Sequence, residues 1–192
     1  MNKLERNLFV SIERNLLMKQ LSCSYIVFSL VILSMILTSI LNLSAQNTSK
    51  DVEISKSTYP QLIEKIQANK GKVILVDFWG EFCLPCKKKF PQFVQLGKRY
   101  LSRGLKTISV SLDDTQDNEA LSRVKDFLQS QNGTGENLIL QEKVEFWQKK
   151  LKTVGPPAIY LFNQNGRLIN RWVGEEIDFF RIERRIQDLL SQ

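Results

Sequence analysis

One stretch of this chain joins an apolar strand to a pair of cysteines. Residues 73–82 read VILVDFWGEF and lead directly into Cys83-Leu84-Pro85-Cys86. A short, nearly continuous apolar run of this kind predicts a buried strand, and a helical pattern begins straight after it. Cys83 therefore falls at or near a helix N-terminus, where unpaired N–H groups and the positive end of the helix dipole favour a thiolate. The thiolate is the form of cysteine that attacks disulfides, so Cys83 is a candidate nucleophile. The second thiol, Cys86, lies within its reach.

The composition excludes several kinds of site. The chain has no histidine, so a Ser-His-Asp or Cys-His nucleophile and a His-ligated metal site are excluded. Its three cysteines are Cys23, Cys83 and Cys86, too few for a disulfide-stapled scaffold or for the roughly four ligands of structural zinc. We therefore expect no metal and no cofactor beyond a redox-active pair, Cys83 and Cys86. An inert disulfide is the alternative, although so short a loop stabilises a fold poorly.

The charge pattern indicates no particular class of binding partner. The chain carries 27 Lys and Arg against 20 Asp and Glu, for a net charge of +7. In the C-terminal three quarters the two signs alternate, as they do on solvated surfaces, and no basic stripe is present. We expect no nucleic-acid partner.

The N-terminal quarter has a long apolar segment. Residues 25–43 read YIVFSLVILSMILTSILNL, and as a helix they would extend roughly 28 Å, close to the thickness of a bilayer core. Basic residues precede this segment, which predicts a cytoplasmic N-terminus and an exported C-terminal part: Lys3, Arg6, Arg14 and Lys19. We expect residues 1–45 to form the cytoplasmic N-terminus and signal or anchor segment, residues 46–58 a polar tether, and residues 59–192 the folded domain.

Two interpretations of the apolar segment remain open. It is either a permanent membrane anchor or a signal peptide cleaved near Ser44-Ala45, and Met18 is an alternative start that would make the signal peptide compact. In both cases the domain lies outside the cytoplasm, on the periplasmic side of a bacterial membrane, where disulfide chemistry persists.

Hydrophobic periodicity predicts the elements of the folded part. Helices are expected over 59–69, 86–103 (interrupted by Pro91), 118–131, 144–151 and 178–191. Strands are expected over 72–78, 106–112, 137–141, 158–163 and 167–173, with a turn at 163–166. Strands that alternate with helices, followed by a hairpin and a last helix, predict an α/β fold with a central mixed β-sheet and helices on both faces.

The cysteine segment resembles the active site of the thioredoxin superfamily. Residues 76–86 read VDFWGEFCLPC. Asp77 lies six residues before Cys83, where thioredoxins keep a buried acid, and Pro91 lies five residues after Cys86, where they have a helix proline.

A second segment matches in the expected order. Residues 154–158, VGPPA, resemble the cis-proline loop; an apolar strand, Gly166 and the sequence WVG at 172–174 follow as in the superfamily. The resemblance covers about residues 52–192 and implies a thioredoxin-like fold, here preceded by an N-terminal hydrophobic helix.

Within the superfamily the chain is most similar to the extracytoplasmic thiol–disulfide oxidoreductases of the TlpA/ResA type. The similarity rests on the apolar N-terminal segment, on the strand end SVSLDD at 109–114, and on the long stretch 114–154. Two departures concern the site. Leu84 stands where thioredoxin has glycine and some relatives have glutamate, and Pro156-Pro157-Ala158 replaces a single proline followed by threonine.

The resemblance implies a role for each site residue. Cys83 would attack a substrate disulfide, and Cys86 would resolve the mixed disulfide. Asp77 would be buried with a raised pKa and take the proton from Cys86. Four further residues would contact the substrate, with Pro157 as the cis residue: Trp79, Pro85, Pro156 and Pro157.

The expected function is reduction of disulfides in exported proteins. A membrane electron donor is expected to re-reduce the cysteine pair. Residues 25–43 are expected to hold the chain in the membrane if they are not cleaved. Two alternatives stay open: a disulfide oxidase or isomerase, and a non-catalytic binding module on the same fold. The sequence leaves the substrate, the donor, the reduction potential and the oligomeric state undetermined.

Overall fold

The computed structural model describes residues 31–35, 52–133, 135–153 and 155–192. The chain divides into two units, Met1–Thr48 and Ser49–Gln192. Residues 31–35 are helical, and the rest of the predicted signal or anchor segment 25–43 lies outside the described residues. In the described ranges, no helix has both the length and the apolar character needed to cross a bilayer.

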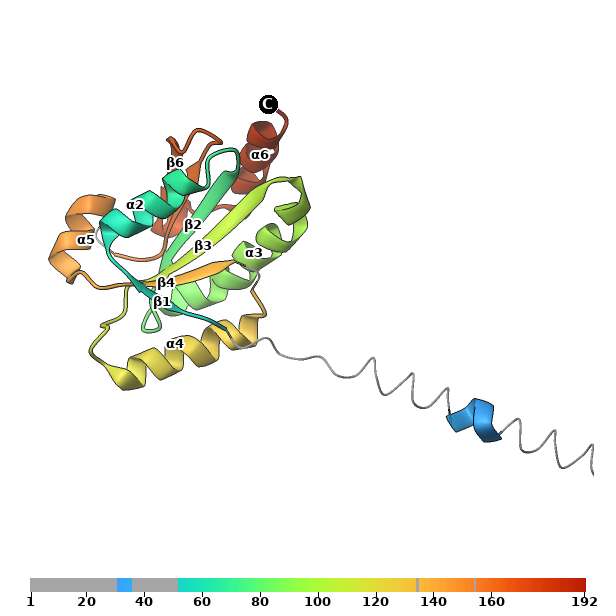
Figure 1. Ribbon diagram of the computed structural model, residues 1–192. Coiled ribbons are helices and arrows are strands. Elements are labelled where there is room, and N and C mark those ends of the chain that lie inside the picture. Colours follow the sequence, from blue (N-terminus) through green and yellow to red (C-terminus); the bar gives the residue numbers. More distant parts are fainter. Residues whose placement is uncertain (1–30, 36–51, 134, 154) are drawn as a thin grey trace, which may run out of the picture. The chain divides into compact units, whose positions relative to one another are not determined.

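The second unit contains a six-stranded sheet with the strand order β1-β4-β3-β2-β5-β6 (Figure 1). Its strands are β1 (Ser55–Ser57), β2 (Val73–Trp79), β3 (Leu105–Ser111), β4 (Glu136–Leu140), β5 (Ala158–Phe162) and β6 (Leu168–Val173). Its helices are α2 (Tyr59–Ala68), α3 (Leu84–Tyr100), α4 (Asn118–Gln131), α5 (Val144–Leu151) and α6 (Phe179–Leu190), with 3₁₀ turns at Leu101–Arg103 and Gly174–Glu176. Strands β1, β4, β3 and β2 are parallel, whereas β5 and β6 pair antiparallel, so the predicted mixed sheet is confirmed.

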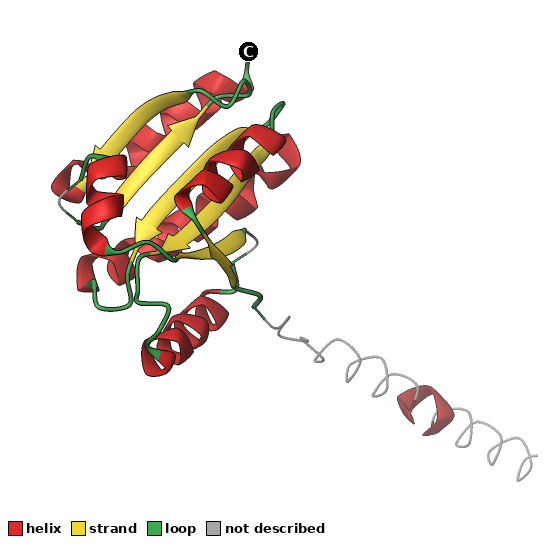
Figure 2. Cartoon of the chain, turned by 60° about the vertical axis from the view of Figure 1, so that its left-hand side comes forward, coloured by secondary structure: helices red, strands yellow, loops and turns green. Residues whose placement is uncertain are grey.

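Strand β2 lies in the middle of two hydrophobic cores, and all seven of its residues are buried. Because successive side chains of a strand point to opposite faces, alternate residues of β2 enter different cores. Val73, Leu75 and Trp79 pack with residues of α3, α4 and α6. Ile74, Val76 and Phe78 pack with residues of α2 and α5. Helices therefore cover both faces of the sheet, as predicted (Figure 2).

The helix boundaries follow local capping signals. Thr58 and Gln61 form a capping box at the start of α2, and the carboxylates of Asp117 and Asp178 accept backbone N–H bonds at the starts of α4 and α6. Helix α3 begins two residues earlier than predicted, continues through Pro91 and gives way to a 3₁₀ turn at Leu101.

Strand β1 has no counterpart among the predicted elements. It lies inside the stretch 46–58 that we predicted to be a polar tether, and its sequence is Ser-Lys-Ser. It forms because its backbone pairs in parallel with β4, for example Ser55 with Leu138. A short polar edge strand of this kind leaves no apolar pattern in the sequence, so periodicity could not reveal it. The predicted domain bounds of 1–45, 46–58 and 59–192 stay predictions.

Candidate active site at the Cys83–Cys86 disulfide

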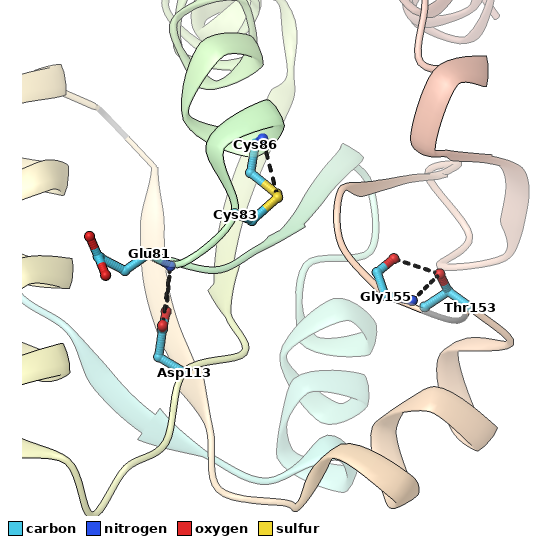
Figure 3. The surroundings of a disulfide bond; sticks show 6 residues. All are labelled: Glu81, Cys83, Cys86, Asp113, Thr153 and Gly155. Atoms are coloured by element: carbon cyan, nitrogen blue, oxygen red, sulfur yellow. Dashed lines mark hydrogen bonds between the residues drawn. A yellow bond between two sulfur atoms is a disulfide. The ribbon is translucent and has the colours of Figure 1, made fainter.

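The two cysteines form a disulfide at the start of α3 (Figure 3). Cys83 is the N-cap residue of the helix, and its N–H donates to the carbonyl of Gly80 at 3.0 Å. The Cα atoms of Cys83 and Cys86 are 5.3 Å apart, and the backbone N–H of Cys86 donates to Sγ of Cys83 at 3.2 Å. The predicted place of Cys83 at a helix N-terminus is confirmed. In the reduced protein, the same N–H donor and the helix dipole favour a thiolate at Cys83.

The surroundings of the disulfide differ on its two sides. Cys86 is 2% exposed and Cys83 is 7% exposed, so Cys83 is the more accessible of the pair. Phe82 and Leu84, on either side of Cys83, are 65% and 59% exposed, and Pro85 is exposed as well. A partner that reaches Cys83 therefore meets an apolar surface.

Asp77 is a buried acid in the middle of the sheet. It is 4% exposed, and burial raises its pKa from 3.8 to about 8. The alternation of β2 puts Asp77 on the same sheet face as Leu75 and Trp79, which is the face that packs against α3, the helix carrying Cys86. The burial and the raised pKa that the sequence predicted are both present, whereas the role of Asp77 in proton transfer stays a proposal.

Trp79 lies in the hydrophobic core that also contains Cys83 and Cys86. Its side chain is fully buried in the oxidised protein, and its predicted contact with substrate stays a prediction. Its ring packs against Phe90 and Phe127, with centroids 5.2 and 4.9 Å away, and its indole N–H donates to the hydroxyl of Ser109 at 2.8 Å. These contacts fix the position of the Trp79 ring at the end of β2.

The proline loop lies at the same end of the sheet as the disulfide. Phe78 pairs with Ala158 in the antiparallel β2–β5 register, so the turn after β2 and the loop before β5 emerge side by side at that end. The Pro156–Pro157 peptide bond is cis, as the resemblance implied for Pro157. Pro157 is buried, and its carbonyl accepts from the N–H of Gly174 at 2.9 Å, whereas Pro156 is half-buried.

The same loop is braced by a threonine side chain. The hydroxyl of Thr153 donates to the carbonyl of Gly155 at 2.8 Å and accepts from the N–H of Gly155 at 3.2 Å (Figure 3). Both bonds constrain the backbone immediately before the two prolines.

Asp113 is a site residue that the sequence analysis missed. It is 6% exposed, and its carboxylate accepts the backbone N–H of Glu81, at 2.9 and 3.1 Å to its two oxygens (Figure 3). The same carboxylate accepts the hydroxyl of Ser111 at 2.7 Å. Burial raises the pKa of Asp113, and the bond from Ser111 opposes that rise. Asp113 therefore pins the turn before Cys83 to the end of β3. The sequence does carry a signal for this residue. Asp113 directly follows the apolar strand predicted over 106–112, just as Asp77 lies within the strand predicted over 72–78.

The side chain of Glu81 ties the same turn to two helices. It forms ion pairs with Lys87 of α3 at 3.0 Å and with Arg123 of α4 at 3.1 Å. Its hydrogen bonds with Lys87 and Arg123 hold the pKa of Glu81 below its usual value. The turn that carries Cys83 is thus fastened by its backbone to β3 and by its side chain to α3 and α4.

We expect Asp113→Ala to lower the free energy of unfolding by about 2 kcal/mol, because the N–H of Glu81 and the hydroxyl of Ser111 lose their buried acceptor. Urea denaturation of the oxidised proteins measures this loss. The matched control is Asp114→Asn at the exposed neighbouring position, where the amide oxygen can still accept the N–H of Gln116, and it should change stability by less than about 0.5 kcal/mol. Equal losses in the two variants would contradict the role assigned to Asp113.

Comparison with known proteins adds an independent line of support. Residues 47–171 match the AhpC/TSA family. The thiol-disulfide oxidoreductase ResA of Bacillus thuringiensis is 31% identical over 110 residues, which are 56% of this chain and 58% of the relative. The sporulation thiol-disulfide oxidoreductase A of Bacillus subtilis is 29% identical over 106 residues, 55% of this chain and 62% of the relative. The match thus spans less than two thirds of the length of either relative.

The solved structures show a shared fold. A thiol:disulfide interchange protein of the thioredoxin family from Chlorobium tepidum has a TM-score of 0.51 and 22% sequence identity, covering 64% of this chain and 83% of that chain. The predicted thioredoxin-like fold is confirmed.

Proposed function

This chain belongs to the AhpC/TSA family, and we propose that it is a thiol–disulfide oxidoreductase that reduces disulfides in exported proteins. One observation carries the proposal: Cys83 caps α3, and its sulfur accepts the N–H of Cys86, the residue to which it is disulfide-bonded. This arrangement stabilises the thiolate at the more accessible cysteine and keeps the second sulfur at bonding distance.

The reaction proceeds through two exchanges. The thiolate of Cys83 attacks one sulfur of the substrate disulfide; a bond between Cys83 and the substrate forms, and the other substrate sulfur leaves as a thiolate that takes up a proton. The sulfur of Cys86 then attacks Cys83, the Cys83–Cys86 disulfide forms, and the first substrate sulfur leaves as a thiolate. Two electrons pass from the dithiol to the substrate.

Asp77 acts in the second exchange. Cys86 is nearly inaccessible to water, so its thiol needs a nearby group that can accept a proton. A carboxyl with a pKa of about 8 is a suitable acceptor near neutral pH, because it both takes up and releases a proton there. The pKa of Asp77 is this high because burial in the core removes water from its carboxylate and disfavours the charged form.

The substrate contacts are assigned to the surface around Cys83. Pro85 is exposed and Pro156 is half-buried, so both offer surface to a partner, and the cis Pro157 shapes the loop that contains Pro156. Phe82 and Leu84 add apolar area, so a substrate segment with apolar residues beside its cysteine fits this surface.

We place the domain outside the cytoplasm, where a membrane electron donor returns electrons to the oxidised pair. Support comes from the apolar segment 25–43 with basic residues before it. A reductase in an oxidising compartment needs such a supply, because each turnover leaves its own cysteines as a disulfide.

The reduction potential of the Cys83–Cys86 pair tests the direction of electron flow. We expect a value near or below about −220 mV when the full chain is equilibrated with a dithiothreitol redox buffer and the thiols are counted by alkylation. The variant Cys23→Ser serves as the reference, because it removes the one thiol outside the pair. A value near about −120 mV would mark an oxidant and reverse the proposed direction.

A further inference from the structure

The sheet face opposite α3 has a pocket away from the disulfide. Its volume is about 480 Å³, within the usual range of small-molecule sites. Phe78, Tyr160 and Phe162 form part of the lining from β2 and β5. The pocket exists because two short helices, α2 with 10 residues and α5 with 8, share this face and leave the region over β5 and β6 partly uncovered.

The ends of the pocket are held in place by hydrogen bonds. Beside α2, the side-chain amide of Gln67 donates to the carbonyl of Gly166 at 3.1 Å. Gly166 has a φ of +72°, a backbone conformation that favours glycine, so the turn that offers this carbonyl depends on glycine. Beside α5, the hydroxyl of Tyr160 donates to the carbonyl of Leu151. The pocket is therefore preformed, with a lining drawn from helices α2 and α5 and strands β2, β5 and β6.

The lining carries positive charge that no carboxylate in the described residues neutralises. It includes Lys150, Lys152 and Arg171 and contains no Asp or Glu. Two of these cations lie over aromatic rings instead: Nζ of Lys150 is 5.6 Å from the ring centre of Phe146, and Cζ of Arg171 is 6.0 Å from that of Tyr160. Cation–π contacts of this kind position a cation and leave its charge available to an anion.

We propose that this basic pocket, defined by Lys150, Lys152 and Arg171 beside the accessible apolar side chains of Ile63 and Leu168, binds a small amphipathic carboxylate. The apolar part of the ligand packs against Leu168, which is 45% exposed, and against the partly exposed Tyr59 and Ile63, because Phe78 and Phe162 beneath them are already buried. The carboxylate pairs with the cations, and the guanidinium of Arg171 is suited to a bidentate contact. The assignment uses no property of the cysteines.

Calorimetric titration of the full chain with 4-phenylbutyrate, and with its neutral amide as the comparison ligand, tests the proposal. We expect the carboxylate to bind and the amide to bind at least about tenfold more weakly, a difference of about 1.4 kcal/mol. The variant with both Cys83→Ser and Cys86→Ser should bind the carboxylate as the wild type does. Binding therefore reports on the pocket even if the proposed thiol chemistry is wrong.

Two lysines of α5 provide a matched pair of variants. Lys150 lines the pocket, whereas the exposed Lys149 beside it does not, and Lys→Glu changes the charge equally at both positions. We expect Lys150→Glu to weaken binding about tenfold and Lys149→Glu to weaken it less than about twofold. Equal weakening in the two variants, equal affinity for acid and amide, or no binding of the carboxylate would overturn the proposal.

A variant in β6 tests the proposal without any substitution in α5, so misfolding of α5 does not affect its result. Leu168 of β6 lines the pocket and is 45% exposed, so Leu168→Glu can be introduced without burying a charge. It should also weaken carboxylate binding several-fold by repulsion. Unchanged affinity in Leu168→Glu would place the ligand elsewhere and would contradict the assignment.

Discussion

Replacing Cys83 with serine is expected to reduce disulfide exchange to the uncatalysed rate. The serine hydroxyl remains at the N-cap of α3, where serine is a favoured residue, so the helix should still form. Without a thiolate at this position, however, no mixed disulfide can be made. Insulin reduction with dithiothreitol as the electron source measures the loss. Full activity in Cys83→Ser would show that the nucleophile is wrongly assigned.

The companion variant Cys86→Ser is expected to give the opposite phenotype. Cys83 can still attack a substrate, but nothing follows to break the mixed disulfide, so the covalent complex should accumulate. Non-reducing electrophoresis followed by mass spectrometry identifies the trapped sulfur. Cys23→Ser is the matched control, because it removes a cysteine of the same chain and should trap nothing. Complexes joined through any cysteine other than Cys83 would contradict the assigned order of attack.

Asp77→Asn is expected to stabilise the protein at neutral pH and to slow its chemistry. The carboxyl has a pKa of about 8 in the folded state and 3.8 as its ordinary value, so between these values the unfolded chain is ionised while the folded protein holds a proton. The unfolded state then binds fewer protons, and the free energy of unfolding falls as pH rises from about 4 to about 8. Asparagine removes this penalty. The expected gain at pH 7 is up to about 4 kcal/mol.

Urea denaturation at pH 4 and pH 7 tests the Asp77 prediction. The variant should be more stable than the wild type at pH 7, and the difference should shrink to below about 1 kcal/mol at pH 4, where the folded carboxyl is protonated and the unfolded one, with its ordinary pKa of 3.8, is only partly ionised. Asp114→Asn, at an exposed position, should change stability little at either pH. A stability gain of the same size at both pH values would show that the burial of charge is not its cause.

The same variant separates the role of Asp77 in catalysis from its effect on stability. Asparagine accepts no proton, so the mixed disulfide should persist longer in Asp77→Asn than in the wild type at pH 7. Quenching the reaction with acid and measuring the trapped complex gives its lifetime. A stabilised variant with an unchanged lifetime would leave Asp77 without the proposed proton-transfer role. A buried acid that lowers stability and is used in the reaction is consistent with the trade-off between stability and activity common at active sites.

The chemistry of the site was predictable because its signals are local. An apolar strand, two cysteines three residues apart and a following helical pattern are contiguous in the sequence, and together they place Cys83 at the N-cap of α3. The burial of Asp77 followed from its apolar neighbours on the same strand. The order of strands and helices likewise depends on the periodicity of each segment, which predicted the mixed sheet before any long-range contact was known.

Other features of the site depend on contacts between segments that are far apart in the sequence, and only the tertiary structure reveals them. Asp113 reaches the N–H of Glu81 because β3 lies beside β2, and strand β1 exists only because β4 offers it backbone partners. The burial of Trp79 depends in part on Phe127 of α4, which packs against its ring and is distant in the sequence.

The basic pocket requires α2, α5 and β6 to meet over one sheet face, and no single segment carries its pattern. Contacts between such distant residues depend on how the strands are ordered and how the helices cover them. A local pattern determines which element a residue joins, and packing determines what that residue touches.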